Sequence, residues 1–267
     1  MPKAVAGLYD GVSVSAARLS GPEVVDSHPD FLKNSMQRER FAWRWDTAEK
    51  FEMNMRNYWG MISGVDHVVG RIRDKVKQLG FADNTIFIFT GDNGYYMGQR
   101  GFAGKWSHHE ESLRVPLVVM DPRSNSTQVK SRDEVVLNID IAPTIVALAG
   151  AARTETHQGA SLQPLLVGEQ VTDWRTDFFC EHLFHIPGRI PKYEGVRGPV
   201  WTYARYFEQE PVYEYLHNLS EDPDQLKNYA TDESYAQQLQ QMRARCDDLM
   251  NELGGEFSLE KFPRRKR

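Results

Sequence analysis

The apolar positions of this chain follow two different periods, and the first long segment is helical. From Asp46 to Leu79, apolar residues recur at steps of three and four, as they do along one face of a helix. Asp46 and Glu49 have the spacing of a capping box at its start, and Gly80 is placed to end it. We expect a buried core face made of Phe51, Met55, Tyr58, Ile62, Val65, Val69, Ile72, Val76 and Leu79.

Short apolar segments without a helical period follow this helix. The segment from Asn84 to Thr90 is rich in β-branched and aromatic residues, which is typical of a strand buried on both faces and favours an α/β fold. Residues 114–120 and 134–138 predict two further strands, and Asp140 is placed to cap a helix that runs to about Leu148. The first 45 residues have no clear period, so we expect irregular surface chain there.

The pattern changes again from about Asp177. The segments Val200–Phe207 and Val212–Leu219 alternate in strand fashion between Gly-Pro and Asp-Pro breaks. Tyr235–Leu253 has the pattern of a polar amphipathic helix. The sequence therefore predicts two domains, an α/β domain over residues 1–176 and a small antiparallel sheet with a C-terminal helix over residues 177–267.

Candidate chemistry lies directly after the strand that ends at Thr90. Asp92 and Asn93 follow it between two glycines, at the end of a strand where α/β sheets bind ligands. A carboxylate beside an amide carbonyl suits a hard cation such as Ca²⁺ or Mg²⁺, and Lys105 can hold an anion. Together they point to a sulfate or phosphate ester. From the residues alone, the Asp-Asn-Gly run is also typical of a tight turn, and a lone lysine of a solvated surface.

The stretch from Thr85 to Pro122 resembles the second signature region of the sulfatases, members of the alkaline-phosphatase-like superfamily. Their pattern is a strand, (S/G)-D-(H/N)-G, a glycine-rich run, G-K and E-E-S-x-R-x-P, and here the chain has GDNGYYMGQRGFAGKWSHHEESLRVPLVV. Two further blocks match in order, at residues 140–168 and 194–228. The resemblance implies that residues 1–176 are the later part of a sulfatase α/β domain and residues 177–267 its small closing subdomain.

The resemblance also implies roles for single residues. Asp92 and Asn93 match the family's late pair of Ca²⁺ ligands, with Mg²⁺ as an alternative, and Lys105 matches the lysine that contacts the sulfate group. Arg100 stands where the family often has histidine; it could reach an acidic sugar, or be an exposed loop arginine. His108 is a candidate proton donor.

For other residues of the matched blocks, the sequence allows either a structural or a substrate-binding role. We expect Glu111 and Arg114 to brace the loop through a salt bridge. His182, His185 and Arg197 are candidates for lining a substrate pocket, and satisfied structural roles are the alternative for each.

The segment that carries the nucleophile of a sulfatase is not found in this sequence. The family uses a Cys or Ser in C/S-x-P-x-R, which is oxidised to formylglycine. Cys180 and Cys246 lack that context, and Ser20-Gly-Pro22 has Val24 where the arginine belongs. The chain thus resembles a sulfatase that begins after its nucleophile, as a truncated gene product, a mis-started reading frame or one half of a split enzyme whose partner is the missing N-terminal half.

Three functions follow from this resemblance. The first is sulfatase-type hydrolysis of sulfate esters on a carbohydrate, with the chain as the C-terminal part. The second is a non-catalytic protein that binds sulfated or other anionic glycans. The third is a phosphodiesterase of the same superfamily. The motif E-E-S-x-R-x-P after G-K favours a sulfatase over a phosphodiesterase.

Composition narrows the partners further. The net charge of −5 over 267 residues leaves no basic footprint for nucleic acid. No apolar run is long enough to span a bilayer, and the start Met1-Pro-Lys-Ala-Val lacks the apolar core of a signal peptide, although the family is often periplasmic, secreted or lysosomal. Two distant cysteines outside any metal-binding spacing predict free buried thiols.

Overall fold

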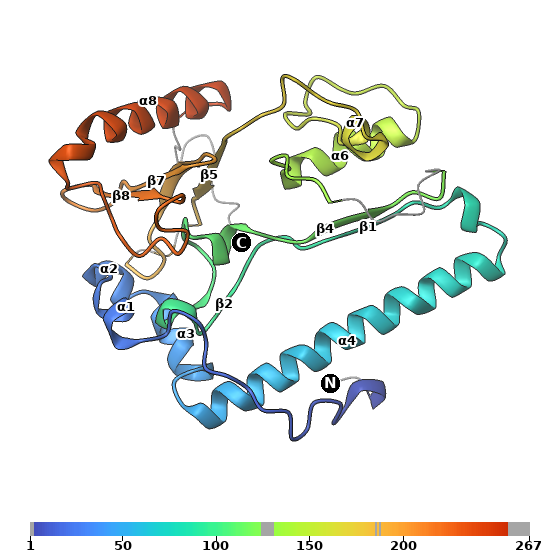
Figure 1. The fold of residues 1–267 in the computed structure, drawn as a ribbon, viewed down its shortest axis with the longest axis horizontal. Helices are drawn as coiled ribbons and strands as arrows, with labels where there is room; N and C mark the ends of the chain where they lie inside the picture. The colour runs from blue at the N-terminus through green and yellow to red at the C-terminus, as the bar shows by residue number, and fades with distance from the viewer. Residues whose placement is uncertain (1–2, 124–130, 185, 187, 256–267) are drawn as a thin grey trace, which may run out of the picture. The chain divides into compact units, whose positions relative to one another are not determined.

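The chain forms two compact units in a computed structural model (Figure 1), which describes residues 3–123, 131–184, 186 and 188–255. Each unit has its own set of helices and strands. The first unit comprises Met1–Trp106, Glu110–Val129 and Ile186–Pro191, and the second comprises Ser107–His109, Lys130–His185 and Lys192–Arg267. The domain boundary between residues 176 and 177 stays a prediction.

The first unit begins with short helical segments rather than the irregular chain that we expected. They are η1 (Lys3–Val5), α1 (Pro22–Asp26), α2 (Asp30–Lys33) and α3 (Met36–Arg44). Proline at the first position of α1 suits a helix start, because its missing N–H would have no intrahelical partner there. Each segment is too short for the period of a helix to show in the sequence.

The long helix α4 (Ala48–Gln78) confirms the predicted helix, but its cap differs from the prediction. The side chain of Thr47 accepts a hydrogen bond from the backbone N–H of Lys50 at 3.2 Å. Asp46 instead forms an ion pair with the Lys50 ammonium at 2.7 Å, so the capping box predicted for Asp46 and Glu49 is wrong. Gly80, with a φ of +76°, follows the end of the helix as expected.

The apolar stripe predicted as the core face of α4 is largely exposed. The buried residues of the helix are Gly60 and Gly64. Within the first unit, α4 contacts η1, α3 and the turn η2 (Ala82–Asn84), and these contacts leave the stripe uncovered. The expectation of burial is therefore wrong for this chain; the exposed members are Tyr58, Ile62, Val65, Ile72 and Leu79.

The predicted strands at residues 84–90 and 114–120 exist, in shortened form. They are β1 (Phe87–Thr90) and β4 (Leu117–Met120), which pair antiparallel with Phe87 opposite Met120. Burial on both faces was wrong, since 44% of Phe89 and 58% of Val118 is exposed. Beyond β1 lie the two-residue strands β2 (Tyr96–Met97) and β3 (Ala103–Gly104), which form a hairpin around η3 (Gln99–Gly101), and the short helix α5 (Glu110–Leu113).

The second unit is built on a four-stranded antiparallel sheet, as predicted (Figure 1). Its strands lie in chain order, so each connection joins neighbours. They are β5 (Phe178–His182), β6 (Tyr193–Arg197), β7 (Trp201–Tyr206) and β8 (Tyr213–Asn218), and the helix that follows them is α8 (Ala236–Glu252), preceded by η5 (Glu233–Tyr235). The mixed α/β class and the small C-terminal sheet with its helix are confirmed.

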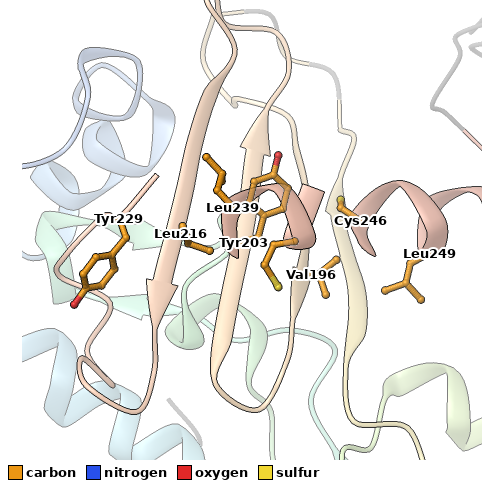
Figure 2. Packing of buried hydrophobic residues seen from close by; sticks show 8 residues of the cluster. Val196, Tyr203, Leu216, Tyr229, Leu239, Cys246 and Leu249 are labelled. Carbon is orange, nitrogen blue, oxygen red and sulfur yellow. The ribbon is translucent and has the colours of Figure 1, made fainter. Parts of the chain in front are cut away.

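The core of this unit lies between the sheet and α8 (Figure 2). The helix contributes buried side chains at steps of three and four, the spacing of one helical face. The cluster comprises Val196, Tyr203, Leu216, Tyr229, Leu239, Met242, Cys246 and Leu249. Both cysteines are free and buried, as expected, and burial raises the pKa of the Cys246 thiol to about 12.

The remaining helices of the second unit are α6 (Ile141–Leu148) and α7 (Gln163–Val167). Residues 134–138 are not a strand; the chain there leads into the turn η4 (Asn138–Asp140). Asp140 is fully buried and accepts hydrogen bonds from the backbone N–H groups of Leu137 and Ala160, at 2.7 and 2.8 Å. It also pairs with Arg175, so one carboxylate ties three segments to the start of α6.

None of the helices in the described ranges is both long and apolar enough to cross a membrane.

Candidate functional site

The loop Gly91–Gly94 follows β1 and is held against α5. The backbone N–H of Gly94 donates to the carbonyl of Ser112 at 2.9 Å. A Cβ at Gly94 would lie 2.2 Å from the carbonyl oxygen of Glu111, so only glycine lets the two segments approach this closely. The E-E-S segment therefore fixes the loop that carries Asp92 and Asn93.

The structure brings Asn93 and Lys105 together. In the β2–β3 hairpin Tyr96 lies opposite Gly104, which returns the chain to the loop just before Lys105. The Lys105 ammonium donates a hydrogen bond to Asn93 Oδ1, and Asn93 Nδ2 donates to the carbonyl of Gly94 at 2.7 Å. Both side chains are half-buried, whereas Asp92 beside them is exposed.

The oxygen atoms at this loop fit a hard cation in kind. Asp92 offers a carboxylate and Asn93 a carboxamide oxygen, the donors that Ca²⁺ and Mg²⁺ prefer. The Asn93 oxygen has a second lone pair besides the one that accepts from Lys105. Because Ca²⁺ takes about six to eight oxygen ligands, these two residues fit as part of a set.

Arg100 is buried, contrary to the alternative of an exposed loop arginine. Its side chain is 2% exposed, and Nε donates to Glu111 Oε2 at 3.1 Å. The residue has a φ of +57°, and its backbone N–H donates to the carbonyl of Leu19 at 2.8 Å. A side chain enclosed in this way braces the loop and does not fit contact with an acidic sugar.

The expected salt bridge between Glu111 and Arg114 is replaced by two other pairs. Glu111 pairs with Arg100, as described above, and Arg114 lies 3.8 Å from Glu110 with 80% of its side chain exposed. Residues four apart face each other on a helix, so α5 directs Arg114 toward Glu110 and leaves Glu111 for the buried arginine.

His28, from an earlier part of the chain, contacts the same loop. Its Nε2 lies 3.2 Å from the carbonyl oxygen of Arg100, and its ring stacks on Phe102 with centroids 4.5 Å apart. The pKa of His28 is lowered to about 4, chiefly because burial desolvates the ring; the hydrogen bond to the Arg100 backbone raises it, and the nearby cations Arg100, Lys33 and Arg38 lower it. His28 is therefore neutral at physiological pH. A carbonyl can only accept, so Nε2 carries the proton.

His108 belongs to the second unit and lies in a cluster of rings. It is fully buried; its Nδ1 lies 3.2 Å from the Tyr206 hydroxyl and its Nε2 lies 3.0 Å from His217 Nε2. His217 Nδ1 lies 2.9 Å from the carbonyl oxygen of Lys227. Because both ring nitrogens of His108 are engaged inside the unit, the geometry does not favour a proton donor to a substrate.

The neighbouring His109 completes this cluster. Its ring centroid lies 4.1 Å from that of His108, and its Nδ1 is 3.5 Å from the Ser107 hydroxyl. The sequence reveals the doublet His108-His109, but His217 was not singled out because it lies 109 residues from His108. Only the position of β8 in the sheet brings it there.

Two of the residues predicted to line a substrate pocket, His182 and Arg197, do not lie together. His182 pairs with Tyr193 at one end of the β5–β6 ladder, and Arg197 pairs with Phe178 at the other. Arg197 Nη1 donates to the carbonyl of Gly198 at 2.9 Å. His185 lies outside the described residues.

Two family models match the chain. The model described as "N-sulphoglucosamine sulphohydrolase, C-terminal" covers residues 98–252, and the model described as "Sulfatase" covers residues 23–151. The matches span the loop, the hairpin, α5 and the C-terminal sheet described above. The chain belongs to the sulfatase family, within the alkaline-phosphatase-like superfamily.

One named relative agrees with this assignment, and a solved structure shares the fold. An N-acetylglucosamine-6-O-sulfatase of Bacteroides thetaiotaomicron is 28% identical over 197 residues, which are 72% of this chain and 35% of that protein. A solved structure in complex with its substrate D-glucosamine-2-N,6-O-disulfate has a TM-score of 0.69 at 24% identity, covering 76% of this chain and 41% of the other.

The fold is also shared with a different kind of hydrolase. The phosphonate monoester hydrolase of Silicibacter pomeroyi has a TM-score of 0.81 at 22% identity, over 94% of this chain and 53% of the other. The chain thus spans between about a third and a half of the length of these three proteins.

Proposed function

We propose that this chain supplies the metal-binding and sulfate-binding part of a sulfatase that hydrolyses sulfate esters of carbohydrates. The contact between the Lys105 ammonium and Asn93 Oδ1 carries this proposal. It places the ammonium group of Lys105, which can bind an anion, beside the oxygen of Asn93, which can bind a metal ion. Binding a sulfate ester together with a divalent ion requires both groups.

Lys105 binds a sulfate oxygen and offsets the negative charge that builds on the sulfate group as its S–O bond breaks. Asn93 orients the lysine through Oδ1, and Gly94 keeps this loop pressed on α5. Asp92 and Asn93 would hold a Ca²⁺ ion, and the ion would supply Lewis-acid chemistry toward a sulfate oxygen. The formylglycine motif of the family is not present in the sequence, so the residues of this chain bind and orient while the nucleophile comes from elsewhere.

A sulfated amino sugar is the substrate class that we propose. The support is the name of the relative that acts as an N-acetylglucosamine-6-O-sulfatase and the solved relative that holds a sulfated glucosamine. Binding of anionic glycans without hydrolysis is the second candidate. The likeness to a phosphonate monoester hydrolase supports the fold alone.

The proposal is tested by calorimetry on the full chain in the presence of Ca²⁺. N-acetylglucosamine 6-sulfate should bind more tightly than N-acetylglucosamine, and Lys105→Ala should remove the difference. Lys75→Ala, which removes an exposed lysine of α4, serves as the matched control and should leave it unchanged. Equal binding of the two sugars to the unmodified chain would overturn the proposal.

A second step separates the enzyme from the binding protein. A chain that comprises the preceding part of a sulfatase domain, with formylglycine in place, is mixed with this one. Hydrolysis that depends on both chains and on Lys105 identifies a split catalytic site. Sulfate-dependent binding without hydrolysis in the mixture identifies the glycan-binding protein.

A further inference from the structure

The second unit contains three buried histidines that converge on one point. His108, His109 and His217 are each at most 1% exposed, and the ligand atoms that they offer all lie within 4.8 Å of one another. We propose that these three imidazoles are the ligands of a transition-metal ion of intermediate softness, and that the ion is Zn²⁺. The three histidines belong to the second unit and Asp92 and Asn93 to the first, and the proposal does not rest on the sulfatase function.

The spacing of the nitrogen atoms supports a metal ion. Two imidazole nitrogens bound to one tetrahedral Zn²⁺ lie about 3.4 Å apart, given Zn–N distances of about 2.0–2.1 Å. His108 Nε2 and His217 Nε2 are 3.0 Å apart, close to this value. The upper bound of 4.8 Å on the separations in the group exceeds it by about 1.4 Å. A small rotation of the side chains would close that difference.

The groups behind the rings are of the kind that orient metal ligands. A metal-bound histidine commonly donates its other N–H to a carbonyl or a similar acceptor, which fixes the tautomer. His217 Nδ1 faces the carbonyl oxygen of Lys227 at 2.9 Å, so Nδ1 carries the proton and Nε2 offers a lone pair to the centre of the group. The Tyr206 hydroxyl lies 3.2 Å from His108 Nδ1 and, unlike a carbonyl, can either donate to it or accept from it.

The proton balance of metal binding can be written from these contacts. Without a metal, His217 Nε2 accepts, so the proton between the two rings sits on His108 Nε2, and His108 Nδ1 accepts from the Tyr206 hydroxyl. With a metal, that proton moves to His108 Nδ1, and the Tyr206 oxygen becomes the acceptor. Both Nε2 atoms then hold the ion. Because the imidazoles are neutral before and after this exchange, no proton is released to the solvent.

The chemistry of the donors selects the class of ion. Imidazole suits Zn²⁺, Cu²⁺ and Ni²⁺, whereas Ca²⁺ and Mg²⁺ take oxygen ligands. Three neutral histidines do not compensate the double positive charge of Zn²⁺. They also leave the fourth tetrahedral position to a water molecule or an anion, as in catalytic zinc sites with three protein ligands. The site is thus of the open kind rather than the closed four-ligand kind.

The test measures Zn²⁺ binding to the metal-stripped full chain by competition with a chromophoric chelator. We expect one Zn²⁺ per chain and a loss of more than about 100-fold in affinity in His109→Phe, which removes one ligand and retains a ring beside His108. Tyr206→Phe keeps all three ligands and should cost about 10-fold to 100-fold. His67→Gln removes an exposed histidine of α4 and should change nothing.

Cobalt(II) gives an independent readout. Loaded into the site, it should show the intense visible bands of tetrahedral coordination, which His109→Phe removes and Tyr206→Phe shifts. Thermal unfolding measured in excess chelator establishes that each variant is folded without metal. If His109→Phe does not fold, the Zn²⁺ affinity of Tyr206→Phe decides the test. Equal Zn²⁺ affinity of the unmodified chain and the variants, or no binding by any, would overturn the proposal and leave the histidines as a structural hydrogen-bonded chain.

Discussion

Lys105 donates a hydrogen bond to Asn93 Oδ1 at the open end of the β2–β3 hairpin, where Asn93 precedes β2 and Lys105 follows β3. The two residues are 12 positions apart in the chain, and the hairpin register sets their approach. The pairing joins the residue expected to bind sulfate to one expected to bind metal, so loss of either should weaken the other function.

The chain alone should not hydrolyse aryl sulfates. A covalent route needs an activated nucleophile, and loss of the nucleophile removes most of a rate enhancement. The sequence has no C/S-x-P-x-R segment from which formylglycine could form. A continuous assay at high enzyme concentration checks this. Turnover above buffer that disappears in Lys105→Ala would point to a nucleophile elsewhere in the chain.

Ca²⁺ should bind this chain weakly, with a dissociation constant above the micromolar range. Affinity at oxygen sites rises with the number of charged ligands, and the loop supplies a single carboxylate, that of Asp92. Calorimetry should show a further weakening in Asp92→Asn, while Asp83→Asn in the exposed η2 turn should have no effect. Submicromolar binding that depends on Asp92 would mean that additional ligands complete the site.

Gly94→Ala should destabilise the first unit by about 1–3 kcal/mol, the usual cost of overpacking. The new Cβ would lie 2.2 Å from the backbone oxygen of Glu111, so the loop must move away from α5. Gly70→Ala in α4 is the matched control. Nothing lies within 4 Å of its Cβ position, and alanine should stabilise the helix by up to about 1 kcal/mol. Denaturant titration measures both, and equal stability of the two variants would contradict the assigned role.

Burial of His28 should make the first unit sensitive to acid. Its pKa is about 4 in the folded chain against 6.5 for an ordinary histidine, so the unfolded state binds the proton first as the pH falls. The stability is fully present above about pH 6.5 and is lost as the pH falls toward 4, by on the order of 3 kcal/mol. Stability measured against pH should lose this slope in His28→Gln and keep it in His67→Gln. An unchanged slope in His28→Gln would refute the assignment.

The chain by itself should associate with second copies through the strands β1 and β4. Among the described residues these strands pair only with each other, and Phe89 and Val118, which face each other in register, are both exposed. Unpaired strand edges with apolar side chains recruit other chains. Val118→Lys should reduce the sedimentation coefficient at a fixed concentration.

Val167→Lys is the control for this association, because Val167 is equally exposed but lies at the end of the short helix α7. A preceding sulfatase segment supplied as a second chain should compete with the self-association. A monomer that is stable over a wide range of dilution, with cooperative melting, would show that the exposed strands need no partner.

Local pattern alone determined much of this protein. The period of the apolar residues located α4 and α8, and the alternation in residues 200–219 located β7 and β8, because these patterns report which side of a helix or strand is apolar. The signature around Asp92 and Lys105 identified the family. The sequence also predicted the free buried cysteines correctly.

Tertiary structure decided which residues meet. Glu111 pairs with the buried Arg100 rather than with Arg114, which lies near Glu110 and is largely exposed. His217 joins His108 and His109 only because β8 takes its place in the sheet. The apolar stripe of α4 was predicted from its period, but its exposure was not. The period indicates that one face is apolar, whereas its burial depends on contacts between segments far apart in the chain.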